Sequence, residues 1–416
     1  MAATQKITED SYYLNFGKGE YLDLKKAQTD LEDNTSWERD IKKMVITPMD
    51  TPMEAEIYFN TPGHTIPKEI LLDTADNCGL MINYDDKEEC LRDCAMPSLL
   101  STVSIRGEGL FRPEKNQQAI ALTALLTGCR EHSTIMRRAG KVAAIVSPKY
   151  EHMPIPELLN ITDDLDQYLG DPEFISGCVS HSLTVAKFQY PDAAQTVTDT
   201  YRTILAAHGR TLAPGQVIIP VVEFRSSDTT GEAAKLLTYL QLSPGHLMPI
   251  GEGVRVNHVM PYEFDELGNR LSGIRKFRHE AQLLYSQLDY DIKELVPAML
   301  ETSIEHPANT FVGLCKKAQI PQKWGGQVEE EIRNDWPNAS GCTFLDVYEY
   351  LTSITKKALE ENSPHGTRLL DLEEAIARIA HNRALWTKYD LPGTVAWVQA
   401  VNKKANATSK SLFHLC

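Results

Sequence analysis

The spacing of apolar residues divides the chain into a mixed region followed by a helical one. Between residues 63 and 279, short apolar runs such as 142–146 and 216–224 predict strands, and segments with apolar residues at helical spacing lie between them. From residue 280 onward the pattern is almost entirely helical, as in 344–361. This change predicts an α+β fold, in which a mixed α/β core with a sheet flanked by helices is followed by a helical C-terminal domain.

Composition and pattern together predict four segments. Residues 1–62 are polar and acidic with isolated aromatic side chains, which is typical of an N-terminal extension. We expect the α+β core at 63–279, the helical C-terminal domain at 280–402 and a polar tail at 403–416.

Three local patterns give more specific expectations inside the core. Pro220 interrupts the apolar run 216–224, and because proline cannot donate a hydrogen bond to a ladder, this predicts an edge strand or a bulge. Ser227 or Asp228 is suited to cap a helix that begins after it. The run that ends at His279 is interpreted as a strand.

The composition is that of an ordinary globular protein, with 42% hydrophobic and 24% charged residues among 416. No apolar run reaches the roughly 18 residues that a membrane span needs. The first residues also lack the hydrophobic core of a secretion signal. We therefore expect a cytoplasmic protein without a membrane partner.

The formal net charge of −15 is unevenly distributed along the chain. Residues 1–100 carry 20 acids against 10 bases, whereas residues 101–150 carry 8 bases against 3 acids. A basic stretch in an acidic protein can guide a polyanion to one place. The bases and the aromatic residue that we expect to contact nucleic acid there are Arg137, Arg138, Lys141, Lys149 and Tyr150. The alternative interpretation is a solvated helix face followed by a turn.

A second basic stretch lies near the end of the predicted core. It consists of Arg275, Lys276, Phe277 and Arg278, and no acid interrupts it. Basic residues with an aromatic residue among them can bind phosphates while the aromatic ring stacks on a nucleobase, as in proteins that bind single-stranded nucleic acid. The alternative interpretation is an exposed strand edge whose charged side chains prevent aggregation, because such an edge has the same residue types.

Motifs for nucleotide hydrolysis and acyl transfer are absent. The sequence contains neither a Gly-x-x-x-x-Gly-Lys-Ser/Thr loop nor a Gly-x-Ser-x-Gly elbow. Asp163, Asp164 and Asp166 could hold a divalent cation. We favour the simpler interpretation, in which Thr162 caps a helix whose first turn carries these acids. We therefore predict no metal and no cofactor.

Three segments resemble a phage and plasmid family that is catalogued as a domain of unknown function, number nine-three-two. Residues 136–159 look like its Arg-rich turn, strand and Ser-x-x-Tyr stretch, 225–234 like its Asn-Ser-Glu-x-Gly stretch, and 344–353 like a C-terminal helical segment. The likeness covers about residues 95–385. The positions that match its motifs are Ser147, Ser227, Asp228 and Gly231. The resemblance implies a mixed α/β core and a mobile-element origin, hence the cytoplasm of a host cell, and it carries no reaction.

These observations lead to three functional hypotheses. The first is a non-enzymatic protein of phage or mobile-element DNA metabolism, an accessory of replication or recombination that binds single-stranded nucleic acid through the two basic stretches. The second is a structural or interaction protein, such as a homo-oligomer, an assembly factor or a counter-defence protein, that acts through its acidic first hundred residues. The third is an enzyme with a dispersed site around Ser147, Tyr150, Ser227 and Asp228.

Overall fold

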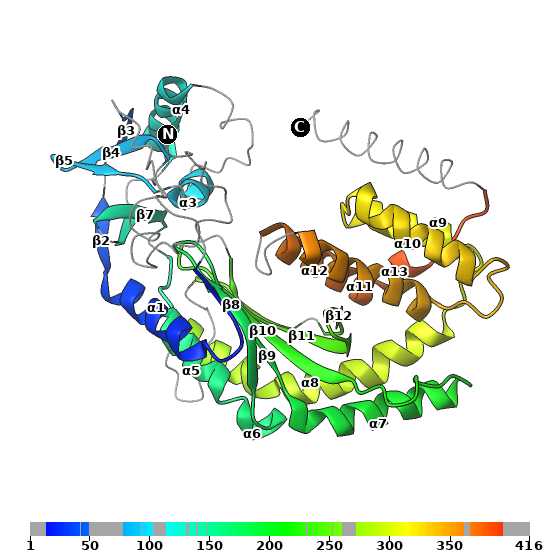
Figure 1. Cartoon of the computed structure of the whole chain (residues 1–416). Helices are drawn as coiled ribbons and strands as arrows, with labels where there is room; N and C mark the ends of the chain where they lie inside the picture. Colours follow the sequence, from blue (N-terminus) through cyan, green and yellow to red (C-terminus); the bar gives the residue numbers. More distant parts are fainter. Residues whose placement is uncertain are drawn as a thin grey trace, which may run out of the picture.

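A computed structural model shows the arrangement of the helices and strands (Figure 1). It describes residues 14–41, 43–49, 78–92, 94–102, 114–129, 133–138, 140–147, 149–229, 232–251, 253–259, 272–361 and 367–393.

The largest sheet has seven strands and is antiparallel throughout. Its order is β1 (Leu14–Phe16), β8 (Glu173–Val179), β9 (Thr184–Gln189), β10 (Ile219–Ser226), β11 (Ala234–Ser243) and β12 (His246–Pro249), with β13 (Val254–Val256) also paired to β11. Since β1 pairs with β8, the chain near its N-terminus belongs to the main sheet. The described residues before position 62 are therefore not a separate extension.

Helices cover both faces of this sheet (Figure 1). One face packs against α1 (Tyr21–Asp33), α5 (Ile155–Asp163), α7 (Pro191–Ala207) and α8 (Gly273–Glu301), with the short α6 (Asp166–Leu169) beside α8. The other face is covered by α11 (Phe344–Glu361) and α12 (Thr367–His381). Consecutive side chains of β10 point to opposite faces of the sheet: Phe224 contacts Phe277 of α8, whereas Arg225 binds Glu373 of α12.

The C-terminal region is helical, as the sequence predicts. It continues from α8 through α9 (Pro307–Lys317), α10 (Gln322–Asp335), α11, α12 and α13 (Arg383–Trp386). Two details differ from the predicted boundary at 279/280. Helix α8 begins at Gly273 and crosses this boundary, and one continuous cluster of buried apolar residues extends from the main sheet into these helices. The helical region therefore shares its core with the sheet.

A smaller lobe is formed by two three-stranded sheets and two helices. The sheets have the orders β2 (Thr35–Ile41), β6 (Ser133–Arg138), β7 (Lys141–Val146) and β3 (Val45–Pro48), β4 (Leu80–Tyr84), β5 (Lys87–Cys90), and the helices are α3 (Ala95–Thr102) and α4 (Lys115–Cys129). The lobe has its own buried apolar cluster, which includes Leu80, Leu99 and Ile145 and shares no residue with the core of the main sheet. We call this unit the N-lobe.

The three local predictions in the core are corrected by this fold. Strand β10 pairs on both sides, with β9 and β11, and Pro220 is tolerated because it lies at the second position of the strand, before the pairing with β9 begins at Val221. Ser227 and Asp228 follow β10 in a turn that leads to β11 and cap no helix. The residues up to His279 form the first turns of α8.

The region around Thr162 also differs from its prediction. Thr162 lies inside α5 near its end, where its hydroxyl donates to the Leu158 carbonyl at 3.1 Å, so it does not cap a helix. Within the described residues, no helix combines the length and the apolar character that crossing a membrane requires.

A network of buried charges joins α12 to the main sheet. Lys187 of β9 lies 2.6 Å from Glu223 of β10 and 3.1 Å from Glu373 of α12, and Arg225 of β10 binds both carboxylates. All four side chains are at most 7% exposed. Two bases thus face two acids, so the charges balance inside the protein.

We expect Glu373→Ala to lower the free energy of unfolding by about 3–5 kcal/mol, because it leaves two buried bases, Lys187 and Arg225, facing the single carboxylate of Glu223 in this network. Urea unfolding followed by circular dichroism measures this loss. The control is Glu331→Ala on α10, whose partly exposed ion pair with Lys357 contributes about 0–1 kcal/mol. Equal losses for the two variants would contradict the structural role of the network.

A second expectation concerns Glu349 of α11, which accepts a hydrogen bond from Tyr201 of α7. Burial, assisted by the charge of Asp346, raises the pKa of Glu349 to about 7. The folded state then holds a proton that the unfolded state releases above about pH 4.5, so this stability is present at acidic pH and is lost as pH rises through 7. Glu349→Gln should raise the melting temperature at about pH 8 and leave it almost unchanged at about pH 5. An equal shift at both pH values would disprove the assignment.

Candidate functional site

The two consecutive arginines predicted to bind phosphate point to opposite sides of β6. The Arg137 side chain is 15% exposed and forms ion pairs with Glu38 of β2 and, at 2.7 Å, with Glu89 of β5. The Arg138 side chain is only 2% exposed and points into the boundary between the N-lobe and the main sheet. Because both guanidinium groups bind acids of the same chain, neither is presented to solvent as a phosphate ligand.

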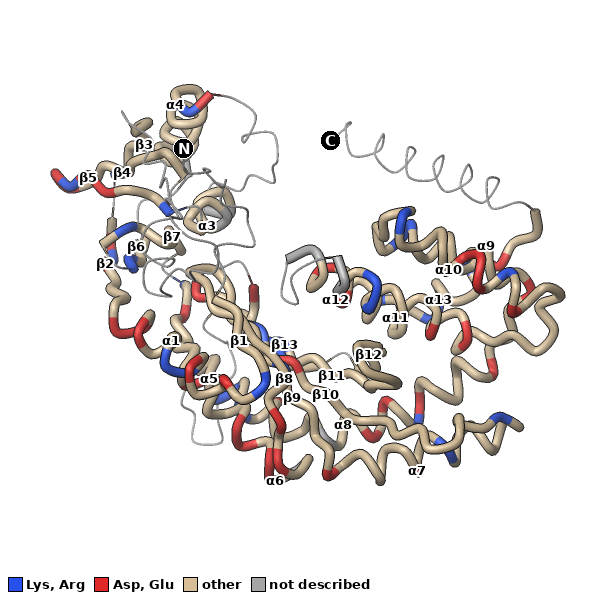
Figure 2. The backbone as a smooth tube through the Cα atoms, in the orientation of Figure 1, with Lys and Arg blue, Asp and Glu red and all other residues tan. Residues whose placement is uncertain are grey.

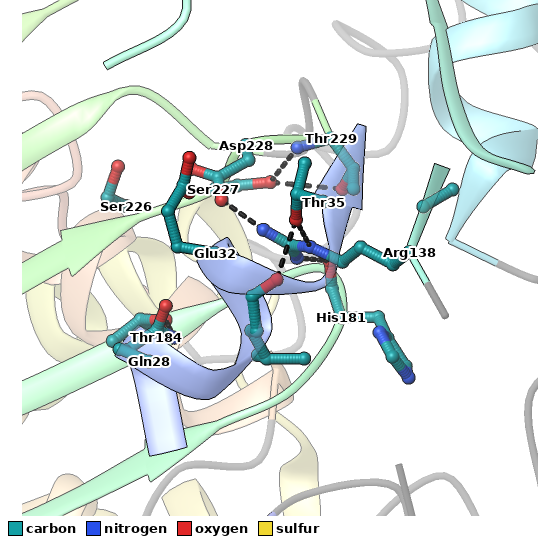
Figure 3. A network of polar contacts seen from close by, with 12 residues as sticks. Gln28, Glu32, Thr35, Arg138, His181, Thr184, Ser226, Ser227, Asp228 and Thr229 are labelled. Carbon is teal, nitrogen blue, oxygen red and sulfur yellow. Dashed lines mark hydrogen bonds and ion pairs between the residues drawn. The ribbon is translucent and has the colours of Figure 1, made fainter. Parts of the chain in front are cut away.

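Arg138 is the centre of a polar cluster at this boundary (Figure 3). Its guanidinium group forms an ion pair with Asp228, whose side chain is fully buried after β10. It also donates to the Thr35 hydroxyl at 3.1 Å and to the His181 carbonyl at 2.7 Å. The Arg138 side chain therefore joins β6 and β2 of the N-lobe to two turns of the main sheet. We call this cluster the junction.

Tyr150 forms the second connection across the junction. Its hydroxyl donates to the Asp228 carbonyl at 2.6 Å, so Arg138 and Tyr150 hold the side chain and the backbone of the same aspartate. The ring lies parallel to that of His258, with centroids 5.5 Å apart, and stacks on Trp37 at 5.7 Å. Because rings lie against Tyr150 in both contacts, it is not available to stack on a nucleobase in this arrangement.

Hydrogen bonds continue from Tyr150 through His258 to Ser226. The Tyr150 hydroxyl lies 3.3 Å from Nδ1 of His258, and the Ser226 hydroxyl lies 3.4 Å from Nε2. Since the Tyr150 proton points to Asp228, we assign the His258 proton to Nδ1, which leaves Nε2 to accept from Ser226. The chain of hydrogen bonds is satisfied by groups inside the protein.

Burial keeps this chain uncharged. Burial, with a smaller contribution from the Asp228 charge, raises the pKa of Tyr150 well above its usual value. Burial also lowers the pKa of His258, although Asp228 opposes this shift. A neutral phenol and a neutral imidazole at pH 7 are suited to fixing the position of Asp228. The Ser226 hydroxyl beside the imidazole is fully buried, so the geometry favours a structural role over nucleophilic attack.

Three further junction residues have no recognisable pattern in the sequence. Glu32 at the end of α1 binds His152 at 2.7 Å, and the His152 ring lies 4.9 Å from that of Trp37. Burial alone would raise the pKa of Glu32, but the hydrogen bond from His152 and the charge of Arg138 lower it overall. No spacing rule connects residues 32, 37 and 152, because only the tertiary fold brings them together.

The residues that carry the family resemblance are only partly brought together. Ser227 is fully buried beside Asp228 and contacts the Thr229 hydroxyl at 3.2 Å. The Ser147 hydroxyl accepts from the Lys149 amide at 3.0 Å and so belongs to the turn before Tyr150. Gly231 lies outside the described residues. Asp228 and Tyr150 are thus in direct contact, as the third hypothesis requires, whereas Ser147 has a local role.

The second basic stretch forms the first two turns of α8. Phe277 has no exposed surface and packs against Phe224, so it belongs to the core and does not stack on a base. Arg275 and Arg278 are exposed, and Lys276 is partly exposed. The helical period explains this difference, because Phe277 alone of the four points toward the sheet.

The end of the first basic stretch lies near the start of α8, although more than a hundred residues separate them in the sequence. Tyr150 forms a bridge with Val259, and the Glu151 amide donates to the His258 carbonyl at 3.1 Å. The Glu151 carboxylate then accepts the Gly273 amide of α8 at 2.9 Å. A Cβ atom at position 273 would lie 2.5 Å from the Met153 sulfur, so a larger residue there would force the Met153 side chain to move. Of the lysines predicted to bind nucleic acid in the first stretch, Lys149 is exposed and Lys141 is partly exposed.

Of the acids considered as an alternative cation site, Asp163 binds other side chains of the protein. Asp163 accepts hydrogen bonds from Tyr21 at 2.5 Å and Lys25 at 2.8 Å. Among the residues that the structure describes, no group of three or more His, Cys, Asp or Glu side chains is arranged to hold a metal ion.

Comparison of the chain with known family models, curated proteins and solved structures finds no match in any of the three. The resemblance to the phage and plasmid family therefore stays a prediction.

The adjacent arginines allow a direct test of the junction. Arg138→Ala leaves Asp228 buried without its partner, so we expect the free energy of unfolding to fall by about 3–5 kcal/mol. Arg137→Ala removes the same charge from a more exposed position and should cost about 1 kcal/mol. Urea unfolding of both variants measures the difference. If Arg137→Ala proved the more damaging, Arg138 would not be the residue that joins the two cores.

Proposed function

We propose that the protein binds single-stranded nucleic acid without catalysing a reaction, as an accessory of DNA replication or recombination in a phage or another mobile element. The observation that carries the proposal is the cluster of basic residues at the start of α8, which Glu151, two residues after Lys149, contacts through the Gly273 amide. The nucleic-acid interface that we propose consists of the exposed or partly exposed bases Lys149, Arg275, Lys276 and Arg278.

The position of these bases on α8 supports the proposal. The N-terminus of a helix carries a partial positive charge, and a base in the first turn costs roughly 0.3–1 kcal/mol of helix stability. The first turn of α8 nevertheless contains no acid, and Arg275, Lys276 and Arg278 follow its cap, Ser272. The sequence thus concentrates positive potential at one end of a 29-residue helix, at a cost in stability that phosphate binding would explain.

The geometry favours contacts to the backbone of the nucleic acid over stacking on its bases. Phe277 is in the core, and the Tyr150 ring is covered by Trp37 and His258. Exposed lysine and arginine side chains without an accessible aromatic ring bind phosphates and discriminate little between nucleotide sequences. We therefore propose binding that depends strongly on salt and weakly on sequence.

The interface can be tested with the double variant Arg275→Ala/Arg278→Ala and a fluorescent single-stranded oligonucleotide. Each lost phosphate contact on a single strand should reduce the slope of log K against log salt by about 0.7, so we expect a decrease of about 1.4. Fluorescence anisotropy at several salt concentrations measures this slope.

The matched control is Lys323→Ala/Arg333→Ala, which removes two positive charges from α10. It should leave the slope unchanged because α10 lies in the C-terminal helical region, away from the start of α8 (Figure 1). Absence of any binding by the parent protein at low ionic strength would refute the proposed function. Equal effects of the two double variants would refute the assigned interface.

A further inference from the structure

A cavity of about 250 Å³ opens between α6, α7 and α8, on the helical side of the main sheet. Its floor is apolar and is formed by Leu169, Val197, Leu288 and Ile292. Two carboxylates, from Asp192 and Asp289, line the same cavity. An apolar floor with acids beside it is chemically unlike the basic start of α8.

The backbone at the end of α6 gives this cavity its form. Gly170 has a φ of +85°, and a Cβ atom there would lie 2.6 Å from the Cβ atom of Asp192. Only glycine therefore allows α6 to end so close to α7. The Asp171 amide donates to the Asp192 carboxylate at 3.2 Å and orients it.

The negative charge of the cavity is only weakly compensated. Asp192 forms no ion pair with a cation among the described residues. Asp289 pairs with Lys293 of the same helix at 2.7 Å, but the two side chains are 44% and 56% exposed. Such an exposed pair contributes little and can exchange with another cation. Figure 2 shows acidic residues around α6, and in the sequence Asp164, Asp166 and Asp171 lie within or next to this helix.

We propose that this cavity is a docking site for a lysine or arginine side chain of a partner protein. The methylene groups of the side chain would cover the floor, and its cationic head would bind Asp192 and Asp289. Charge complementarity identifies the partner, because the same acids repel a phosphate backbone and therefore exclude nucleic acid. The proposal is independent of nucleic-acid binding at the start of α8.

The experiment uses the full chain and three fluorescent peptides of equal length, which carry lysine, arginine or norleucine at alternate positions between glycines. We expect the lysine and arginine peptides to bind at low ionic strength and the norleucine peptide not to bind. Asp192→Asn and Asp289→Asn should each weaken the binding by about three- to tenfold. Fluorescence anisotropy measures the affinities.

Two further variants separate docking from general attraction to an acidic protein. Thr196 is an exposed residue of α7 that lines the cavity. Thr196→Phe fills the cavity without changing the charge, and it should abolish peptide binding. Asp199→Asn removes an exposed acid from the same helix outside the cavity and should change the affinity less than twofold. Binding that survives Thr196→Phe, or that weakens equally in Asp199→Asn and Asp192→Asn, would overturn the proposal. Equal binding of the norleucine peptide would overturn it as well.

Discussion

The buried ion pair between Arg138 and Asp228 is the constraint on which the arrangement of the two lobes depends. The N-lobe and the main sheet have separate apolar cores, so burial of apolar surface within each core does not determine how the two are oriented. A guanidinium group that contacts a carboxylate, a hydroxyl and a carbonyl has one favourable geometry. Tyr150 adds a second attachment to the same aspartate. Orientation thus comes from directional polar contacts, and stability comes from the two cores.

The same division of roles recurs where α12 meets the main sheet. On one face of the sheet, Phe224 and its neighbours pack against α8 in the apolar core. On the other face, Lys187 and Arg225 meet Glu373 in a charge network that is almost fully buried. Replacing such a network by apolar residues often preserves stability, so its advantage lies in selecting one position of the helix. Both polar interfaces involve β10 or the turn that follows it. This strand therefore positions both the N-lobe and α12 relative to the main sheet.

The sequence predicts the broad architecture because periodicity is a local property. The strand at 142–146, the mixed core and the helical region after it all follow from the spacing of apolar residues. The errors arise where tertiary contacts decide. The run that contains Phe277 fits a strand or a helix, and in the structure it begins α8, where Phe277 packs against Phe224. In the same way, Arg137 and Arg138 form one basic stretch in the sequence, while Glu38, Glu89 and Asp228, which bind them, are distant along the chain. The third hypothesis names Tyr150 and Asp228 together as candidate site residues, but only the fold shows that they are in contact.

Helix α8 connects the two surfaces that carry opposite charge. Its first two turns contain the bases Arg275 and Arg278, and Asp289 follows 11 to 14 residues later, about 16–21 Å along the axis. This separation exceeds the screening length of about 8 Å at physiological ionic strength, so the start and the middle of the helix each present their own potential to a ligand. The two ligands that we propose, a polyanion and a cationic side chain, would then bind without direct competition. Because α8 is also part of the main core, a rigid element sets the distance between the two surfaces.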